Sequence, residues 1–168
     1  LVSISLLQAN GHYFEGNIVW GNQVGFGFAQ STGNQILRNK IYSNTQNGLT
    51  FLLSGSTNEV HYCNISGNTK FGLNVLDPAT SVDAIYNWWG SDLGPYQIST
   101  NPTGTGDDVS SYVTYRPWGY ENYPPSIEAM DVINVSEDEV FEKVFTAFDR
   151  NGDTVTWSES HEAAWLNW

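Results

Sequence analysis

Three stretches of the sequence share one pattern: N-I-V-W-G-N-Q-V-G-F-G-F (residues 17–28), N-K-I-Y-S-N-T-Q-N-G-L-T-F (residues 39–51) and N-I-S-G-N-T-K-F-G-L-N-V (residues 64–75). Each stretch has an asparagine at the same place, 22 or 24 residues from the next, and these are Asn22, Asn44 and Asn68. A glycine follows each asparagine, and then come two apolar residues that are two positions apart, as in Phe26 and Phe28. The chain therefore contains an internal repeat of about two dozen residues.

The repeat predicts short strands that stack along an axis. Apolar residues two apart place one face of a short strand inward, and a single copy cannot bury that face alone. Stacking of successive copies, strand on parallel strand, forms a continuous core. The asparagines are expected to form a ladder of side-chain hydrogen bonds, and the glycine before each strand to occupy a corner with positive φ. Residues 2–6 already alternate between apolar and serine, which predicts a strand and further rungs upstream.

Two later segments fit the end of such a solenoid. Residues 86–90 read Y-N-W-W-G, with G-P at 94–95, and residues 113–118 read V-T-Y-R-P-W. Together with the repeat they resemble the right-handed parallel β-helix family, the solenoids of pectate-lyase-like enzymes and many microbial surface proteins, in which an N-W-W-G…G-P signature closes the helix. The resemblance implies an all-β, right-handed, single-stranded parallel β-helix over residues 1–118, whose open end is covered by the two tryptophans of the signature.

Charge divides the chain into two parts. The whole sequence has 6 Lys+Arg and 18 Asp+Glu, a net charge of −12, which excludes nucleic acid as a partner because phosphates are neutralised by a basic face. Residues 1–90 carry four acids and three bases (−1), and residues 91–168 carry the other fourteen acids and three bases (−11). No apolar stretch is long enough for a membrane span.

A second module is expected after the β-helix. Pro124 and Pro125 interrupt any ladder or helix, so residues 119–125 are interpreted as a linker. Residues 126–168 resemble the opening strands of cadherin-like and immunoglobulin-like domains of secreted proteins, and only part of such a β-sandwich would be present. The alternative is a helix over residues 137–148 followed by an EF-hand loop.

Either interpretation of the second module involves a calcium site. Asp149, Asn151 and Asp153 alternate in a tight turn that contains a glycine, and carboxylate and amide oxygens are ligands that calcium prefers. In the EF-hand alternative, Thr154 stands where the loop requires glycine, which disfavours that alternative. The three residues are the predicted metal ligands, and calcium the predicted cofactor.

The first half offers little for polysaccharide lyase or hydrolase chemistry. Its carboxylates are few and widely spaced: Glu15, Glu59, Asp77 and Asp83. Glycoside hydrolysis requires two carboxyl groups about 5 to 9.5 Å apart. Glu59 and Asp83 are 24 residues apart and could be neighbours on adjacent rungs, but solvated turn residues are the simpler interpretation. No catalytic residue is therefore predicted.

The sequence contains few side chains suited to soft metals and several aromatic residues suited to sugars. Cys63 replaces the first asparagine of its repeat and is interpreted as a buried, inert thiol. A β-helix of the kind associated with periplasmic copper delivery is a further possibility, disfavoured because the sequence has only 3 His and 1 Met. Four aromatic residues near the closing end could stack on sugars, although a role in capping the core would explain the tryptophans without a ligand: Trp88, Trp89, Tyr96 and Trp118.

These observations predict a structural or adhesive β-helix module of an extracellular or cell-surface protein. They predict no catalysis by the residues present, no nucleic acid partner and a polysaccharide or another cell-surface component as the candidate partner. The alternative is a polysaccharide lyase or glycoside hydrolase of the pectate-lyase-like type, whose active groove would lie upstream of residue 1.

Overall fold

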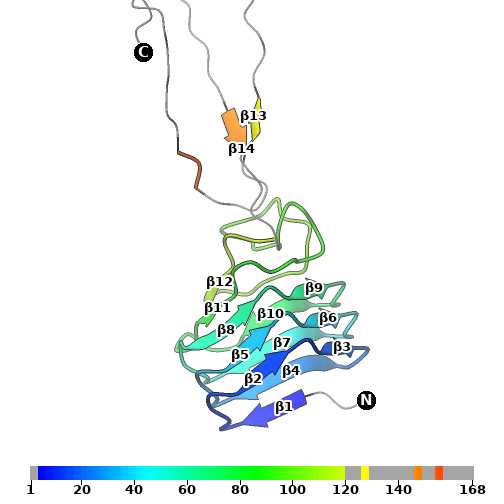
Figure 1. The fold of residues 1–168 in the computed structure, drawn as a ribbon, viewed down its shortest axis with the longest axis vertical. Helices are drawn as coiled ribbons and strands as arrows, with labels where there is room; N and C mark the ends of the chain where they lie inside the picture. The colour runs from blue at the N-terminus through cyan, green and yellow to red at the C-terminus, as the bar shows by residue number, and fades with distance from the viewer. Residues whose placement is uncertain (1–3, 120–125, 129–145, 149–153, 157–168) are drawn as a thin grey trace, which may run out of the picture.

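A computed structural model describes residues 4–119, 126–128, 146–148 and 154–156, and its described secondary structure is all β (Figure 1). Three parallel sheets, here called A, B and C, run along the molecule. Sheet A contains β1 (Ile4–Leu7), β4 (Val24–Ala29), β7 (Asn47–Leu52) and β10 (Phe71–Val75). Sheet B contains β2 (Tyr13–Glu15), β5 (Gln35–Leu37), β8 (Asn58–His61), β11 (Val82–Asp83) and β12 (Val113–Thr114). Sheet C contains β3 (Ile18–Trp20), β6 (Lys40–Tyr42) and β9 (Asn64–Ser66).

The chain visits the three sheets in turn, so that each circuit forms one rung. Every strand pairs in parallel with the strand one repeat away, as in β3 with β6 and β4 with β7. Phe26 is the register partner of Leu49, and Val19 of Ile41, as the spacing of the repeat requires. The predicted parallel β-helix is confirmed, with about three turns.

Inward residues of the three sheets form one core. They are apolar and buried, and include Phe26, Phe28, Ile36, Ile41, Leu49, Phe51, Val60, Ile65 and Leu73. Rings on neighbouring rungs lie over one another: the centroids of Phe28 and Phe51 are 4.7 Å apart and their planes differ by 7°. The alternation of apolar and polar residues in the repeat thus places the apolar side chains of one rung over the apolar side chains of the next.

The expected asparagine ladder forms at the corner between sheets C and A. Asn22 N donates to Asn44 Oδ1 at 3.1 Å, and both N and Nδ2 of Asn44 donate to Asn68 Oδ1, at 3.1 and 2.8 Å. All three asparagines are buried. Hydrogen bonding along the ladder satisfies backbone groups that the corner would otherwise leave buried and unpaired.

The glycine before each strand has a different role from the expected one. Gly25, Gly48 and Gly72 do not have positive φ. A Cβ on Gly48 would lie 2.6 Å from the carbonyl oxygen of Gly72, so the position requires glycine because the next rung leaves no space. Positive φ occurs instead at other corner positions, among them Arg38 and Tyr62.

The far end of the β-helix is closed by the segment that follows residue 87. Trp88 forms a parallel bridge to Asn64 and extends sheet C, while Val109 bridges to Leu73 and extends sheet A. Trp89 is completely buried in the core between these extensions. The prediction that two tryptophans cover the end of the core is confirmed for Trp89, whereas Trp88 is half-buried and is not part of the core.

The described residues beyond the β-helix are few. β13 (Ser126–Glu128) and β14 (Thr146–Phe148) form an antiparallel pair. Because residues 146–148 are a strand, the helix expected over 137–148 in the EF-hand alternative is wrong at its C-terminal end. Asp149, Asn151 and Asp153 lie outside the described residues. Within the described part of the chain, no helix could span a membrane.

Candidate functional site

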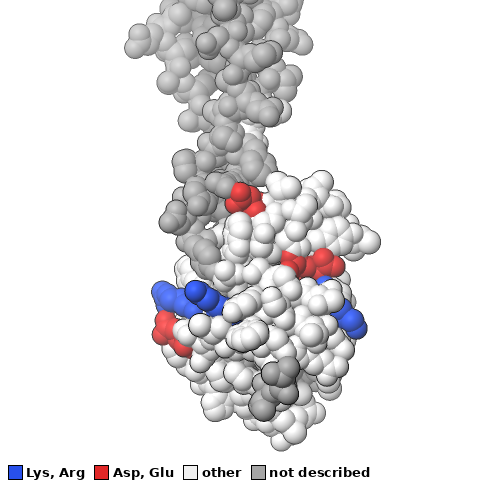
Figure 2. Space-filling model, turned by 90° about the vertical axis from the view of Figure 1, so that its right-hand side faces the viewer, with Lys and Arg blue, Asp and Glu red and all other residues white. Residues whose placement is uncertain are grey.

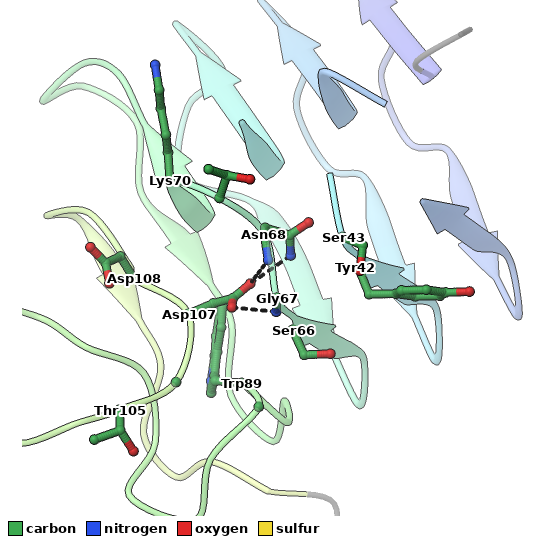
Figure 3. A pocket seen from close by; sticks show the side chains of 13 residues that line it. Tyr42, Ser43, Ser66, Gly67, Asn68, Lys70, Trp89, Thr105, Asp107 and Asp108 are labelled. Carbon is green, nitrogen blue, oxygen red and sulfur yellow. Dashed lines mark hydrogen bonds between the residues drawn. The ribbon is translucent and has the colours of Figure 1, made fainter. Parts of the chain in front are cut away.

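A groove lies where sheet C turns into sheet A, next to the closing segment (Figure 3). Its volume is about 570 Å³. Its walls come from two rungs and the closing segment, and the lining residues are Tyr42, Ser43, Ser66, Gly67, Asn68, Thr69, Lys70, Trp89, Gly90, Thr105, Gly106, Asp107 and Asp108. Most of these side chains are polar, in contrast to the core immediately beneath them.

Asp107 ends the asparagine ladder inside this groove. Its Oδ2 accepts hydrogen bonds from Asn68 N at 3.0 Å and Asn68 Nδ2 at 2.7 Å, and its Oδ1 accepts from Gly67 N at 2.7 Å (Figure 3). Burial raises the pKa of Asp107, although these hydrogen bonds act in the opposite direction. The carboxylate therefore anchors the closing segment to the rungs, and three donors already occupy it.

Other polar groups in the groove are free to meet a ligand. Among the described residues, the side chains of Ser43, Lys70 and Asp108 have no hydrogen-bond or ion-pair partner. Figure 3 shows Tyr42 and Ser43 on one side of the groove and Asp108 and Thr105 on the other. Burial raises the pKa of Asp108. The arrangement suits recognition of a polar ligand.

Two of the four predicted sugar-binding residues are buried. Trp89 is 0% exposed and Trp118 is 5% exposed, so neither ring can stack on a sugar without leaving the core. Trp118 packs against Gly94, where a Cβ would lie 2.6 Å from its ring. Trp88 and Tyr96 are half-buried, and their predicted contact with a sugar stays a prediction.

Sequence reasoning missed an aromatic pair on the surface of sheet C. Trp20 and Tyr42 stack on the outer face of sheet C, with ring centroids 6.3 Å apart and planes that differ by 8°. Both residues directly follow an inward residue of the repeat, Val19 or Ile41, and they are 22 positions apart. That spacing was the signal that could have identified them.

The carboxylates of the solenoid take part in local contacts. Glu59 and Asp83 are register partners on β8 and β11, so the possibility that they are neighbours on adjacent rungs is confirmed, and their interpretation as turn residues is wrong. Gln35 Nε2 donates to Glu59 at 3.0 Å, and His61 Nε2 lies 3.3 Å from Asp83 Oδ2. Neither carboxylate lines the groove.

Glu15, at the other end of sheet B, also accepts hydrogen bonds from neighbouring side chains. It accepts hydrogen bonds from Tyr13 Oη at 2.8 Å and from Arg38 Nη1 at 2.9 Å. The hydrogen bond from Tyr13, followed by that from Arg38, lowers the pKa of Glu15. The carboxylate is thus held in its ionised, acceptor form by its neighbours.

The described residues do not form a metal site. No group of three or more His, Cys, Asp and Glu side chains in this part of the chain converges on one point. Cys63 is buried and its Sγ donates to the carbonyl oxygens of Ile36 and His61, at 3.3 and 3.4 Å. Burial raises its thiol pKa to about 11, so the thiolate that a soft metal requires is disfavoured. The interpretation of Cys63 as a buried corner residue is confirmed.

Comparison with known proteins identifies one family. The model of the family described as "Periplasmic copper-binding protein (NosD)" matches residues 2–88, just over half of the chain. No curated protein and no solved structure matches the chain. The matched range contains the complete set of stacked rungs up to the first tryptophan of the closing signature.

Proposed function

The chain belongs to the NosD family of periplasmic copper-binding proteins, and we propose that it works as a structural or adhesive β-helix module in the periplasm or at the cell surface. The observation that supports the proposal is that the buried polar side chains of the solenoid form hydrogen bonds between rungs. Buried asparagines and Asp107 hold successive rungs together, so these groups are committed to the scaffold. The outer faces remain available for binding.

The acidic residues support binding over catalysis. Glycosidases require one carboxyl group as an acid and a second as base or nucleophile, both directed at the scissile bond. Of the two carboxylates in the groove, Asp107 already accepts three hydrogen bonds, which leaves Asp108 as the one without a partner among the described residues. Glu15 accepts two hydrogen bonds, and Glu59 and Asp83 lie on sheet B, outside the groove. The polysaccharide lyase or hydrolase alternative therefore gains no support from the described residues of the groove.

The family description names copper, but we do not propose a copper site in the described part of this chain. Copper is bound by thiolate, thioether and imidazole ligands. Of the candidates that the structure describes, the Cys63 thiol is buried among carbonyl groups, His61 lies beside Asp83, and His12 is on another rung. These residues do not fit a copper site.

We also propose that residues 119–125 are a linker and that residues 126–168 begin a β-sandwich with a calcium site at Asp149, Asn151 and Asp153. The antiparallel pairing of β13 with β14 supports a β-rich segment. A calcium-dependent rise in the melting temperature of the complete second domain is the expected result, and its absence would remove the calcium proposal.

Two measurements test the proposed function. Incubation of the full chain with neutral and acidic polysaccharides is expected to release no reducing ends and no unsaturated uronides. Equilibrium dialysis against Cu(I) is expected to show no tight copper binding. Turnover of any polysaccharide would establish the enzyme alternative, and a copper affinity that disappears in the His61→Ala variant would establish a copper site in the solenoid.

A further inference from the structure

Sheet C presents an aromatic pair to solvent. Trp20 of β3 and Tyr42 of β6 are register partners on adjacent rungs, and their rings stack. Trp20 is 60% exposed, and Ile18 on the same strand is 62% exposed. An apolar surface of this kind, in continuity with a groove, is typical of a binding site.

The stack ends where the groove begins. The register partner of Tyr42 on the next rung is Ser66, and Gly90 lies beyond it: a Cβ on Gly90 would be 3.3 Å from the Cβ of Ser66. Neither residue has a ring, so the column of aromatic side chains lacks a third member. Tyr42 lines the groove at this level (Figure 3). A flat ring from a ligand can therefore continue the stack on Tyr42.

The polar groups of the groove beside Tyr42 indicate the class of ligand. Hydroxyl groups of Ser43, Ser66 and Thr105 and the ammonium group of Lys70 line the groove. A sugar ring has an apolar C–H face that stacks on an aromatic ring and hydroxyl groups at its rim that require hydrogen-bond partners. The groove supplies both kinds of contact.

Charge favours a neutral ligand. Figure 2 shows the molecule from the side on which Figure 1 places β3, β6 and β9, and most of this face carries no charged side chain. Across the outer face of sheet C and the groove, the ammonium groups of Lys40 and Lys70 balance the carboxylates of Asp107 and Asp108. The site therefore has no net charge that would attract an anionic polymer.

We propose that the outer face of sheet C and the adjoining groove bind a neutral polysaccharide chain, with one sugar ring stacked on Tyr42 and the neighbouring part of the chain over Trp20. This inference rests on the proposed function as a binding module and adds the class of ligand and its site. The sugar contacts would be made by Trp20 and Tyr42, which belong to the repeat.

Native affinity electrophoresis tests the proposal with gels that contain galactomannan, xyloglucan or hydroxyethylcellulose, and with polygalacturonate as an anionic comparison. We expect a neutral polysaccharide to retard the full chain. Trp20→Ala and Tyr42→Ala should each weaken retardation by about tenfold in apparent affinity, the loss of one aromatic stacking contact. The control is Tyr13→Ala, which removes an aromatic side chain that is 54% exposed on sheet B and should leave retardation unchanged.

A blocking variant separates lost binding from lost folding. Ser66→Trp adds the missing third ring, so it should abolish retardation while the far-UV spectrum and melting temperature are retained. Equal retardation of Trp20→Ala, Tyr42→Ala and the control would overturn the site, and retardation by polygalacturonate alone would overturn the ligand class. Absence of retardation in every gel would also overturn the inference, whereas the module function fails only if turnover or copper binding is found.

Discussion

The buried asparagine ladder can be tested at its middle member. Asn44→Ala removes the Oδ1 acceptor of Asn22 N, at 3.1 Å, and the Nδ2 donor to Asn68 Oδ1, at 2.8 Å. Asn68 Oδ1 retains the hydrogen bond from the backbone N of residue 44, so the donor of Asn22 is the group left without a partner. An orphaned buried donor costs about 1–3 kcal/mol and a lost hydrogen bond about 1 kcal/mol, so we expect a loss of about 2–4 kcal/mol in the free energy of unfolding.

Urea denaturation of the full chain, followed by tryptophan fluorescence and far-UV circular dichroism, measures this loss. With a urea slope of about 2 kcal/mol per M, the midpoint should fall by about 1–2 M without a change of slope. Asn74→Ala is the matched control, because Asn74 lies in β10 on the outer face of sheet A and its side chain makes no hydrogen bond with a described residue. A midpoint shift in Asn44→Ala no larger than that in the control would refute the argument that the ladder stabilises the rungs.

Two further predictions concern Cys63. Cys63→Asn should raise the free energy of unfolding by about 1 kcal/mol. The amide oxygen can accept the hydrogen bond that Asn39 N now makes to Sγ at 3.4 Å, and the amide nitrogen can donate to the carbonyls that the thiol now contacts. A lower urea midpoint would show that the corner cannot hold the larger group. The folded thiol pKa of about 11 lies above its ordinary value of 9.0, so the associated stability is present below pH 9 and is lost as the pH rises through 11, at up to about 1.4 kcal/mol per pH unit. The difference in urea midpoint between wild type and Cys63→Asn across that range measures the effect, and parallel profiles would contradict it.

The repeated part of the fold could be predicted because stacking imposes the same demand on every rung. Phe26 and Leu49 had to be apolar and 23 residues apart to meet in the core, and the asparagines had to recur at one corner to bond each other. The prediction that these glycines have positive φ was wrong. They are required because the next rung leaves no space for a Cβ, and that distance between rungs cannot be derived from the spacing of residues in the sequence.

The candidate site was harder to predict because it forms where the repeat is broken. Asp107 takes the place of the next ladder asparagine 39 residues after Asn68, so no periodicity connects the two. Sugar contact was predicted for four aromatic residues near the closing end, but two of them, Trp89 and Trp118, fill the core. A terminal rung must bury large apolar side chains to close the solenoid, and that demand removes such rings from the surface.

Membership of the NosD family and the absence of fit to copper among the described residues have a common physical basis. The match covers residues 2–88, where inward and corner positions must repeat for rungs to stack. Outward positions face solvent and are under no such demand: along sheet C, the column that begins with Trp20 continues with Tyr42 and then Ser66. A β-helix can therefore keep its family fold while its ligand changes with a few outward side chains. In this chain those side chains include aromatic rings and hydroxyl groups, and for this reason the ligand we propose is a sugar chain and not a metal ion.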